Sequence, residues 1–481
     1  MSEQGLKSKT VSGIVWSLIE RLSVQAIFFI ITVIMARLLT PHDYGLIGLL
    51  AIFIEVSQAL VDSGFGQALI RKQNRTEEDN CTMFYFNIVV SSFLYLCLWL
   101  IAPLVAKFYD APLLCPVMRV VCLGIIFNSF GFVQRALLTI KLDFKTQMKS
   151  SLIAAIISGV VGIWMAYNNY GIWAIAAQQI SNYGINTGIL WLLTKWRPRL
   201  LYSWKSFREM FGFGSKLVAA SILNTVYNNI YQIVIGKVFS PSSLGHYTRA
   251  KQFADFPSAN LSNIIQRVTF PVLCELQNDD ERLKMAYVKT LRMIAFIIFP
   301  IMCGLAGVAK PLIAILLGEK WMFCATLLSI ICFSFMWNPI HSLNLNLLQV
   351  KGRSDLFLKL EIIKKIWGVF ILVVTVPFGL IVMCYSMILS TIVGLWINTY
   401  YTGKIIGVGF LRHLKEVLPI LLISLLMSAL LFVVQFFVAN NILCLVISIL
   451  MGIVFYFVAV RMTKIKEMNE LLLMIKSFVK K

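Results

Sequence analysis

Long apolar stretches and short polar or basic clusters follow one another along the whole chain. Fourteen of the apolar stretches are long enough to cross a hydrocarbon core of about 30 Å as helices. Apolar and polar residues do not alternate along them, as they would in the strands of a membrane barrel. The pattern therefore predicts an all-α integral membrane protein of about fourteen transmembrane helices. The predicted spans are 13–36, 44–70, 83–106, 113–134, 150–168, 171–194, 212–236, 243–266, 293–309, 322–348, 361–377, 380–402, 417–438 and 442–460.

The composition supports a protein that mostly faces lipid. Of its 481 residues 59% are hydrophobic and only 14% are charged, and the mean hydropathy is +0.82, values far from those of ordinary water-soluble domains. The net charge of +21 is spread over short patches between the spans. It therefore does not indicate a nucleic-acid-binding face.

The basic residues also predict the orientation of the chain. With the N-terminus inside, 33 of the 43 Lys and Arg residues flank the inner ends of the spans and six flank the outer ends. Basic residues near span ends stay in the cytoplasm. We therefore expect both termini to be cytoplasmic.

Two segments of the chain repeat. Arg37-Leu-Leu-Thr-Pro-His-Asp-Tyr-Gly45 recurs 200 residues later as Lys237-Val-Phe-Ser-Pro-Ser-Ser-Leu-Gly245, and Leu137–Lys141 is echoed at Leu347–Lys351. Six spans separate equivalent points, so two six-helix lobes are related as a parallel repeat. The predicted domains are an N-lobe (1–194), an interfacial cytoplasmic linker (195–211), a C-lobe (212–403), two extra helices (404–461) and a basic cytoplasmic tail (462–481).

Signatures of catalysis and metal binding are missing from the sequence. It has no GxxxxGK[ST] loop for a nucleoside triphosphate and no HExxH pair, and its ten cysteines form no CxxC pair. We expect no enzymatic activity, no cofactor and no metal site, and a carrier rather than an enzyme.

Ionisable residues inside the apolar spans are the main functional candidates. Each costs roughly 2.5–3.5 kcal/mol at mid-helix, so it should face the protein interior or water. They are Glu20, Arg21, Glu55 and Asp62 in the N-lobe, and Lys216, Arg249, Lys251 and Asp255 in the C-lobe.

The basic members of this set are candidate anion-binding residues. Arg21 lies roughly 12 Å along the first helix, and Lys216 lies near the inner end of the seventh. Both are placed to meet an anion from the cytoplasm, or alternatively they extend to the headgroups. Arg249 and Lys251 lie near the outer end of the eighth helix, where Lys251 and Asp255 also have the i, i+4 spacing of a salt bridge.

The acidic and polar members suggest two further roles. If transport is coupled to protons or sodium, Glu55, Asp62 and Asp255 are the candidate acids, although Asp62 also suits an ion pair with Arg71 or Arg21. Polar and aromatic residues on the seventh helix suit either sugar binding or helix packing. The ones we select as substrate-binding candidates are Asn224, Tyr227, Asn228 and Tyr231.

Several motifs resemble a known family. They are Tyr44-Gly-Leu, the segment from Asp62 to Lys72, Leu244-Gly-His-Tyr-Thr-Arg-Ala, Phe256-Pro, Arg267-Val-Thr-Phe-Pro271, Gln277-Asn-Asp-Asp-Glu-Arg282 and Gly318-Glu-Lys-Trp321. The chain resembles the Wzx-type polysaccharide exporters, in particular the branch with the colanic acid and teichuronic acid exporters. Their superfamily also contains multidrug exporters and lipid II flippases.

This resemblance implies a V-shaped central cavity between two six-helix lobes, in the bacterial plasma (inner) membrane. It implies that the protein flips an undecaprenyl-pyrophosphate-linked oligosaccharide to the outer leaflet for lipopolysaccharide, capsule or exopolysaccharide synthesis. A polysaccharide polymerase and a chain-length regulator are the partners that this role suggests. By position, Arg21, Arg249 and Lys251 correspond to the cavity residues of related flippases.

Three other functions remain as alternatives. A multidrug exporter of the same superfamily would use acids and aromatic residues for cationic drugs, yet the embedded groups here are four basic and four acidic. A membrane polymerase or ligase would usually carry a sizeable outer loop, and every predicted outer loop is short. A purely structural scaffold would leave the embedded charges unexplained.

Overall fold

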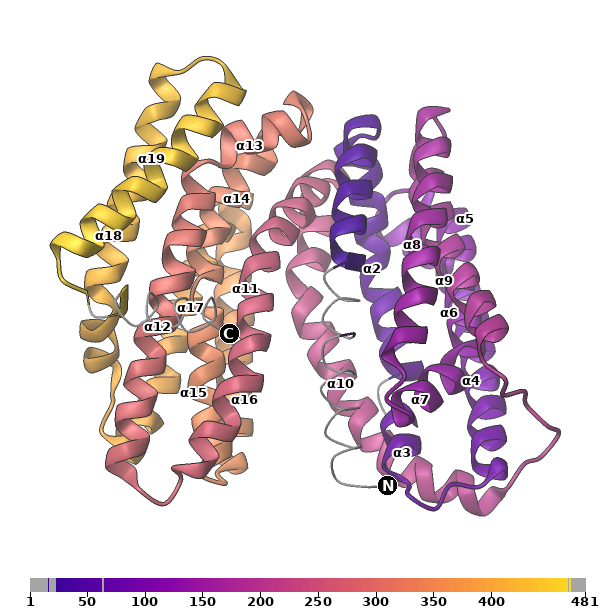
Figure 1. Cartoon of the computed structure of the whole chain (residues 1–481). Helices are drawn as coiled ribbons and strands as arrows, with labels where there is room; N and C mark the ends of the chain where they lie inside the picture. Colours follow the sequence, from indigo (N-terminus) through magenta and orange to yellow (C-terminus); the bar gives the residue numbers. More distant parts are fainter. Residues whose placement is uncertain (1–15, 17–22, 63–64, 466, 469–481) are drawn as a thin grey trace. The chain divides into compact units, whose positions relative to one another are not determined.

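The computed structural model describes residues 16, 23–62, 65–465 and 467–468, and within these residues it is helical without any strand (Figure 1). The helices are α2 (Pro41–Asp62), α3 (Phe65–Arg71), α4 (Glu77–Phe108), α5 (Leu114–Val121), α6 (Leu123–Phe130), α7 (Phe132–Ile140), α8 (Phe144–Tyr167), α9 (Ile172–Leu193), α10 (Trp204–Val238), α11 (Pro241–Glu275), α12 (Asp280–Gly307), α13 (Ala309–Leu316), α14 (Met322–Phe335), α15 (Asn338–Val350), α16 (Ser354–Thr375), α17 (Leu380–Ile406), α18 (Phe410–Phe437) and α19 (Asn441–Met462). A shorter apolar helix, Ser23–Leu38, precedes them. The predicted all-α class is confirmed.

Within the described residues, each predicted span overlaps a helix or a broken helix. In the described residues eight helices are long and apolar enough to cross a membrane, and a bent pair formed by Leu114–Phe130 and Phe132–Ile140, with an angle of 41°, brings the number to nine. Large apolar side chains on these helices point outward. Trp164 of α8, for example, is 62% exposed. Such exposure suits a surface covered by lipid.

The chain forms two compact units, Met1–Gly245 (unit 1) and His246–Lys481 (unit 2). α10, which the repeat assigns to the C-lobe, packs against α2 and α3 in unit 1, while α11 begins in unit 1 and continues into unit 2. α10 also begins earlier than its predicted span, so residues 204–211 of the predicted linker form its first two turns. The lobe boundaries drawn from the repeat stay a prediction.

The two copies of the longer repeat form the same local structure, a capped helix start. The backbone N–H of Asp43 donates to Thr40 Oγ1 (3.2 Å), and that of Ser243 donates to Ser240 Oγ (3.1 Å). A proline follows the cap in each copy as the first helical residue, where its fixed φ suits the helix and its missing N–H removes no bond. The motif therefore repeats because both positions start a helix.

The two helix starts also contact each other inside unit 1. The Cα of Gly45 faces the carbonyl group of Pro241, and the Cα of Gly245 faces the carbonyl group of Pro41. A Cβ atom at either glycine would overlap that backbone oxygen. The two repeat copies need glycine here because the backbones approach too closely for any side chain.

Candidate functional site

In unit 1 a carboxylate lies where α2 crosses α10. Asn229 Nδ2 donates to Glu55 Oε2 at 2.6 Å and to the Thr225 carbonyl at 3.0 Å. Asn229 is 2% exposed, whereas Glu55 is exposed. The buried amide therefore fixes the position of a carboxylate whose remaining surface is accessible.

A second polar contact lies three residues further along α2. Gln58 Nε2 donates to the hydroxyl of Tyr183 on α9, and the next residue back, Asn182, donates to Ser158 Oγ of α8 at 3.3 Å. These residues are not among the candidates predicted from the sequence, because Gln, Asn, Ser and Tyr carry no charge. The polar run Gln178-Gln-Ile-Ser-Asn-Tyr183 inside an otherwise apolar span was the available signal.

The polar series on α10 divides between the surface and the helix interface. Asn224 and Asn228 are exposed, Tyr227 and Tyr231 are half-buried, and the neighbouring Asn229 is the one that is buried against α2. Asn224 and Asn228, one turn apart, thus lie at the surface of α10. Asn229, which was not among the selected candidates, has the packing role that we had offered as the alternative.

Four candidates cannot be placed in this site. Glu20 and Arg21 lie outside the described residues, and the side chains of Asp62 at the end of α2 and Lys216 in α10 are also outside them. Their proposed roles stay predictions.

The candidates of the eighth predicted span lie in unit 2, within two turns of α11. Arg249 Nη1 donates to Gln252 Oε1 at 2.5 Å, so this guanidinium has an amide partner on its own helix. Asp255 is exposed and Lys251 is half-buried. Two basic groups and one acid therefore occur together on this part of α11.

Unit 2 contains a buried polar network that sequence reasoning did not find. The Tyr287 hydroxyl donates to Asn344 Oδ1 at 2.8 Å and lies 2.8 Å from His413 Nε2, and Thr402 Oγ1 donates to the same Asn344 oxygen at 3.0 Å. All four side chains are at most 1% exposed. They come from α12, α15, α17 and α18, and only the tertiary fold brings them together.

An ion cluster lies next to this network. Arg292 of α12 donates from Nε to Glu416 Oε2 of α18 at 2.6 Å, and its Nη1 lies 3.8 Å from Glu467 Oε1. Glu416 is one turn beyond His413 on α18. The first extra helix is therefore joined to α12 by both neutral and charged hydrogen bonds.

The two extra helices also form an apolar groove of about 600 Å³. Its lining consists of Leu430, Ile447, Leu450, Met451, Val454, Phe455, Val458, Ala459 and Met462. A groove of this size and composition suits a hydrocarbon chain. Among the described residues, no group of three or more His, Cys, Asp or Glu side chains is arranged to hold a metal ion.

Long apolar helices with polar contacts held between them define the class, a multi-span helical membrane protein. The fold is that of a solved structure of the lipid II flippase MurJ in an inward closed conformation, with a TM-score of 0.76, 13% sequence identity, and coverage of 94% of this chain and 98% of that one. A multidrug transporter of the MATE family in an inward-facing conformation has the same fold, with a TM-score of 0.63 and 15% identity over 80% of this chain and 98% of that one.

The family follows from the sequence itself. Residues 34–326, more than half of the chain, match the polysaccharide biosynthesis protein family, and the chain belongs to it. The lipopolysaccharide biosynthesis protein WzxC of Escherichia coli (strain K12) is 26% identical, over 75% of this chain and 73% of the relative. The resemblance to polysaccharide exporters is confirmed.

Proposed function

We propose that the protein is a flippase that moves an undecaprenyl-pyrophosphate-linked oligosaccharide from the cytoplasmic to the outer leaflet. The observation that carries this proposal is the family match over residues 34–326, joined to a transporter fold. The polar contacts at the α2–α10 crossing add support, because a passage for sugars must offer hydrogen bonds. The protein would act in the bacterial inner membrane with both termini in the cytoplasm.

The physical difficulty for such a carrier is to take a pyrophosphate and many hydroxyl groups past hydrocarbon, where each unsatisfied polar group costs several kcal/mol. A water-filled cleft removes most of that cost. In this proposal Arg21 and Lys216 attract the pyrophosphate, and Arg249 and Lys251 hold it as the carrier opens outward. Asn224, Tyr227, Asn228 and Tyr231 hydrogen-bond to the sugars.

The lipid tail needs no polar path. It stays in hydrocarbon while the headgroup crosses, and the apolar groove between α18 and α19 offers it a surface on the protein. Because this groove lies outside the two repeats, tail and sugar would contact different parts of the chain.

The membrane potential supplies a driving force. Export of two negative charges across 100 mV, with the cell interior negative, is favourable by roughly 4.6 kcal/mol. ATP is then unnecessary. If a cation is coupled to transport as well, Glu55, Asp62 and Asp255 are the acids that would bind it.

The test is the leaflet location of radiolabelled undecaprenyl-pyrophosphate oligosaccharide in cells that lack the gene, cells in which it is restored, and cells that carry Arg21→Ala. We expect accumulation in the inner leaflet of the deletion strain, cured by the restored gene and not by Arg21→Ala. An unchanged distribution in a deletion strain without a redundant flippase would refute the proposal and favour multidrug export. Cure by Arg21→Ala would refute only the role of that residue.

A further inference from the structure

The segment between α9 and α10 is held rigidly on the end of α4. Three hydrogen bonds do this: from Trp196 Nε1 to Glu77 Oε1 (2.7 Å), from the Arg199 N–H to Cys81 Sγ (3.3 Å), and from the Ser203 N–H to Thr82 Oγ1 (2.9 Å). Contacts from both ends and the middle leave the segment little freedom to rearrange. The side chains on the surface of this segment therefore have a fixed position relative to α4.

The segment displays large apolar side chains. Leu200 is 94% exposed, Trp204 66% and Tyr202 54%. Trp204 also contacts Phe207 in the first turn of α10, with ring centroids 4.9 Å apart, and Phe207 stacks in turn on Phe211 at 5.2 Å. These apolar side chains lie along one segment and the first turns of α10, so they form a group rather than singly exposed residues.

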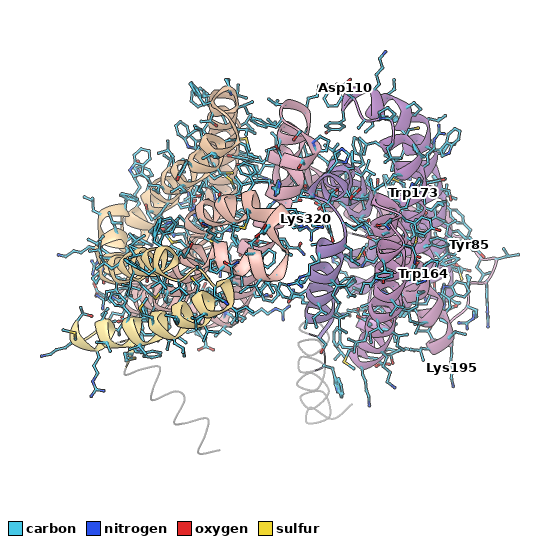
Figure 2. The ribbon with its side chains drawn as sticks, turned by 90° about the horizontal axis from the view of Figure 1, so that it is seen from above. Tyr85, Asp110, Trp164, Trp173, Lys195 and Lys320 are labelled. Carbon is cyan, nitrogen blue, oxygen red and sulfur yellow. The ribbon has the colours of Figure 1, made fainter. Side chains whose placement is uncertain are left out.

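The same segment carries cations that the described residues do not neutralise. Lys195, Arg199, Lys205 and Arg208 are exposed, and the structure gives none of them an ion pair with any described residue. No acid occurs between positions 195 and 208. The next residue, Glu209, is bound 2.9 Å from Lys72. Figure 2 shows Lys195 on the rim of unit 1.

The remaining cation of the segment, Arg197, has a different role. Its guanidinium donates to the carbonyl groups of Trp191 (2.6 Å) and Thr194 (2.7 Å), and so caps the end of α9. Such a cap is a structural contact, because it satisfies carbonyl groups that the helix leaves unpaired. We therefore exclude Arg197 from the binding surface.

We propose that Lys195, Arg199, Lys205 and Arg208, with the apolar side chains of Leu200, Tyr202 and Trp204, bind the headgroups of anionic phospholipids in the cytoplasmic leaflet. Lys and Arg near the membrane are attracted by its negative surface potential, and Trp and Tyr prefer the headgroup level. An acidic soluble protein would pair with the cations but would leave the apolar side chains without a partner. The apolar side chains favour lipid, because Leu192 and Leu193 in the last turn of α9, 83% and 46% exposed, continue the same apolar surface into the span.

The test measures lipid contact at Trp204 in the full chain. The purified protein is placed in phosphatidylcholine nanodiscs with about one fifth of either brominated phosphatidylglycerol or brominated phosphatidylcholine. The quenching of Trp204 is the difference between the wild type and Trp204→Phe. We expect brominated phosphatidylglycerol to quench Trp204 about twofold more than brominated phosphatidylcholine does, and high salt to reduce the preference.

Two matched variants distinguish lipid binding by these four cations from a general effect of the protein's positive charge. In Lys195→Gln/Arg199→Gln/Lys205→Gln/Arg208→Gln the preference for phosphatidylglycerol should disappear. In Lys145→Gln/Lys149→Gln/Arg267→Gln/Lys359→Gln, which removes four other exposed cations and changes the net charge equally, it should persist. Equal quenching by the two lipids in the wild type, or a preference that survives the first variant, would overturn the proposal. Absence of any quenching would place Trp204 away from lipid and also overturn it.

Discussion

One contact between helices in unit 1 and one in unit 2 are made by different means. In unit 1, α2 and α11 meet through bare backbone at Gly45 and Gly245, and Glu55 further along α2 is exposed. In unit 2, α12, α15, α17 and α18 meet through polar side chains that are almost completely buried, with Tyr287 and His413 at the centre.

The exposure of the polar groups in these two contacts indicates which of them only pack helices together and which could bind a ligand. In unit 2 the hydroxyl of Tyr287 has protein partners on two sides and no exposed surface, so it is not available to a ligand. At the α2–α10 crossing of unit 1, Asn229 is buried by packing, whereas the Glu55 carboxylate that it contacts keeps an accessible surface. A polar residue in an apolar span is therefore a functional candidate only where packing leaves part of it uncovered.

The largest effect should come from the backbone contact in unit 1. Gly45→Ala places a methyl group on the Pro241 carbonyl, and overpacking against rigid backbone should cost about 3 kcal/mol or more. Thermal unfolding in detergent, followed by the reaction of the buried cysteines with a thiol-reactive dye, measures the loss. Gly184→Ala is the control because nothing lies within 4 Å of that position. Equal unfolding temperatures for the two variants would contradict the close contact.

The network of unit 2 should respond next. His413→Leu removes one partner of the Tyr287 hydroxyl and leaves buried polar groups less well satisfied, which should cost about 1–3 kcal/mol. The same unfolding measurement applies. His42→Leu is the comparison, since His42 is exposed. If both leucine variants unfold like the wild type, the network does not hold α18 in place.

The accessible carboxylate of unit 1 should matter for transport more than for stability. Glu55→Gln keeps an oxygen that accepts from Asn229 and removes the charge, so we expect unfolding within about 0.5 kcal/mol of the wild type. Flipping of the labelled substrate should fall about tenfold, which corresponds to about 1.4 kcal/mol. Glu78→Gln changes another exposed acid, at the start of α4. Equal transport by the two variants would remove Glu55 from the site.

The smallest effect should come from an ion pair at the edge of unit 1. Lys72 Nζ lies 3.0 Å from Asp79 Oδ1 and 2.9 Å from Glu209 Oε2. Burial by itself would lower the pKa of Lys72, but the hydrogen bonds to Glu209 and Asp79 raise it above its ordinary value of 10.5. Lys72→Met should cost about 0.5–1 kcal/mol.

The raised pKa also fixes how this loss depends on pH. The stabilisation is fully present below the unfolded pKa of 10.5 and is lost only as the pH rises through the higher folded value. The difference between the wild type and Lys72→Met should therefore be the same at pH 7 and pH 9. A difference that shrinks across this range would show that Lys72 is not held by its two acids.

The candidate site was only partly predictable. Glu55 was found because a carboxylate inside an apolar span is costly and therefore conspicuous. Gln58, Tyr183 and Asn182 were missed because uncharged polar residues are common in helix packing. Asn229 and Asn228 are adjacent and chemically identical, yet one is buried and the other is exposed. A helix turns by about 100° per residue, so this choice depends on which side α2 approaches.

The sequence by itself determined the membrane class and the long apolar helices, because crossing hydrocarbon demands a long apolar run. It also determined the two capped helix starts, since a Ser or Thr followed by proline acts on its own neighbours. Only the tertiary structure decided that the glycines of the two repeats face each other's prolines, and that Tyr287 meets His413 across 126 positions. The physical reason is that burial and hydrogen bonding depend on the helix that packs alongside, and no local pattern specifies that neighbour.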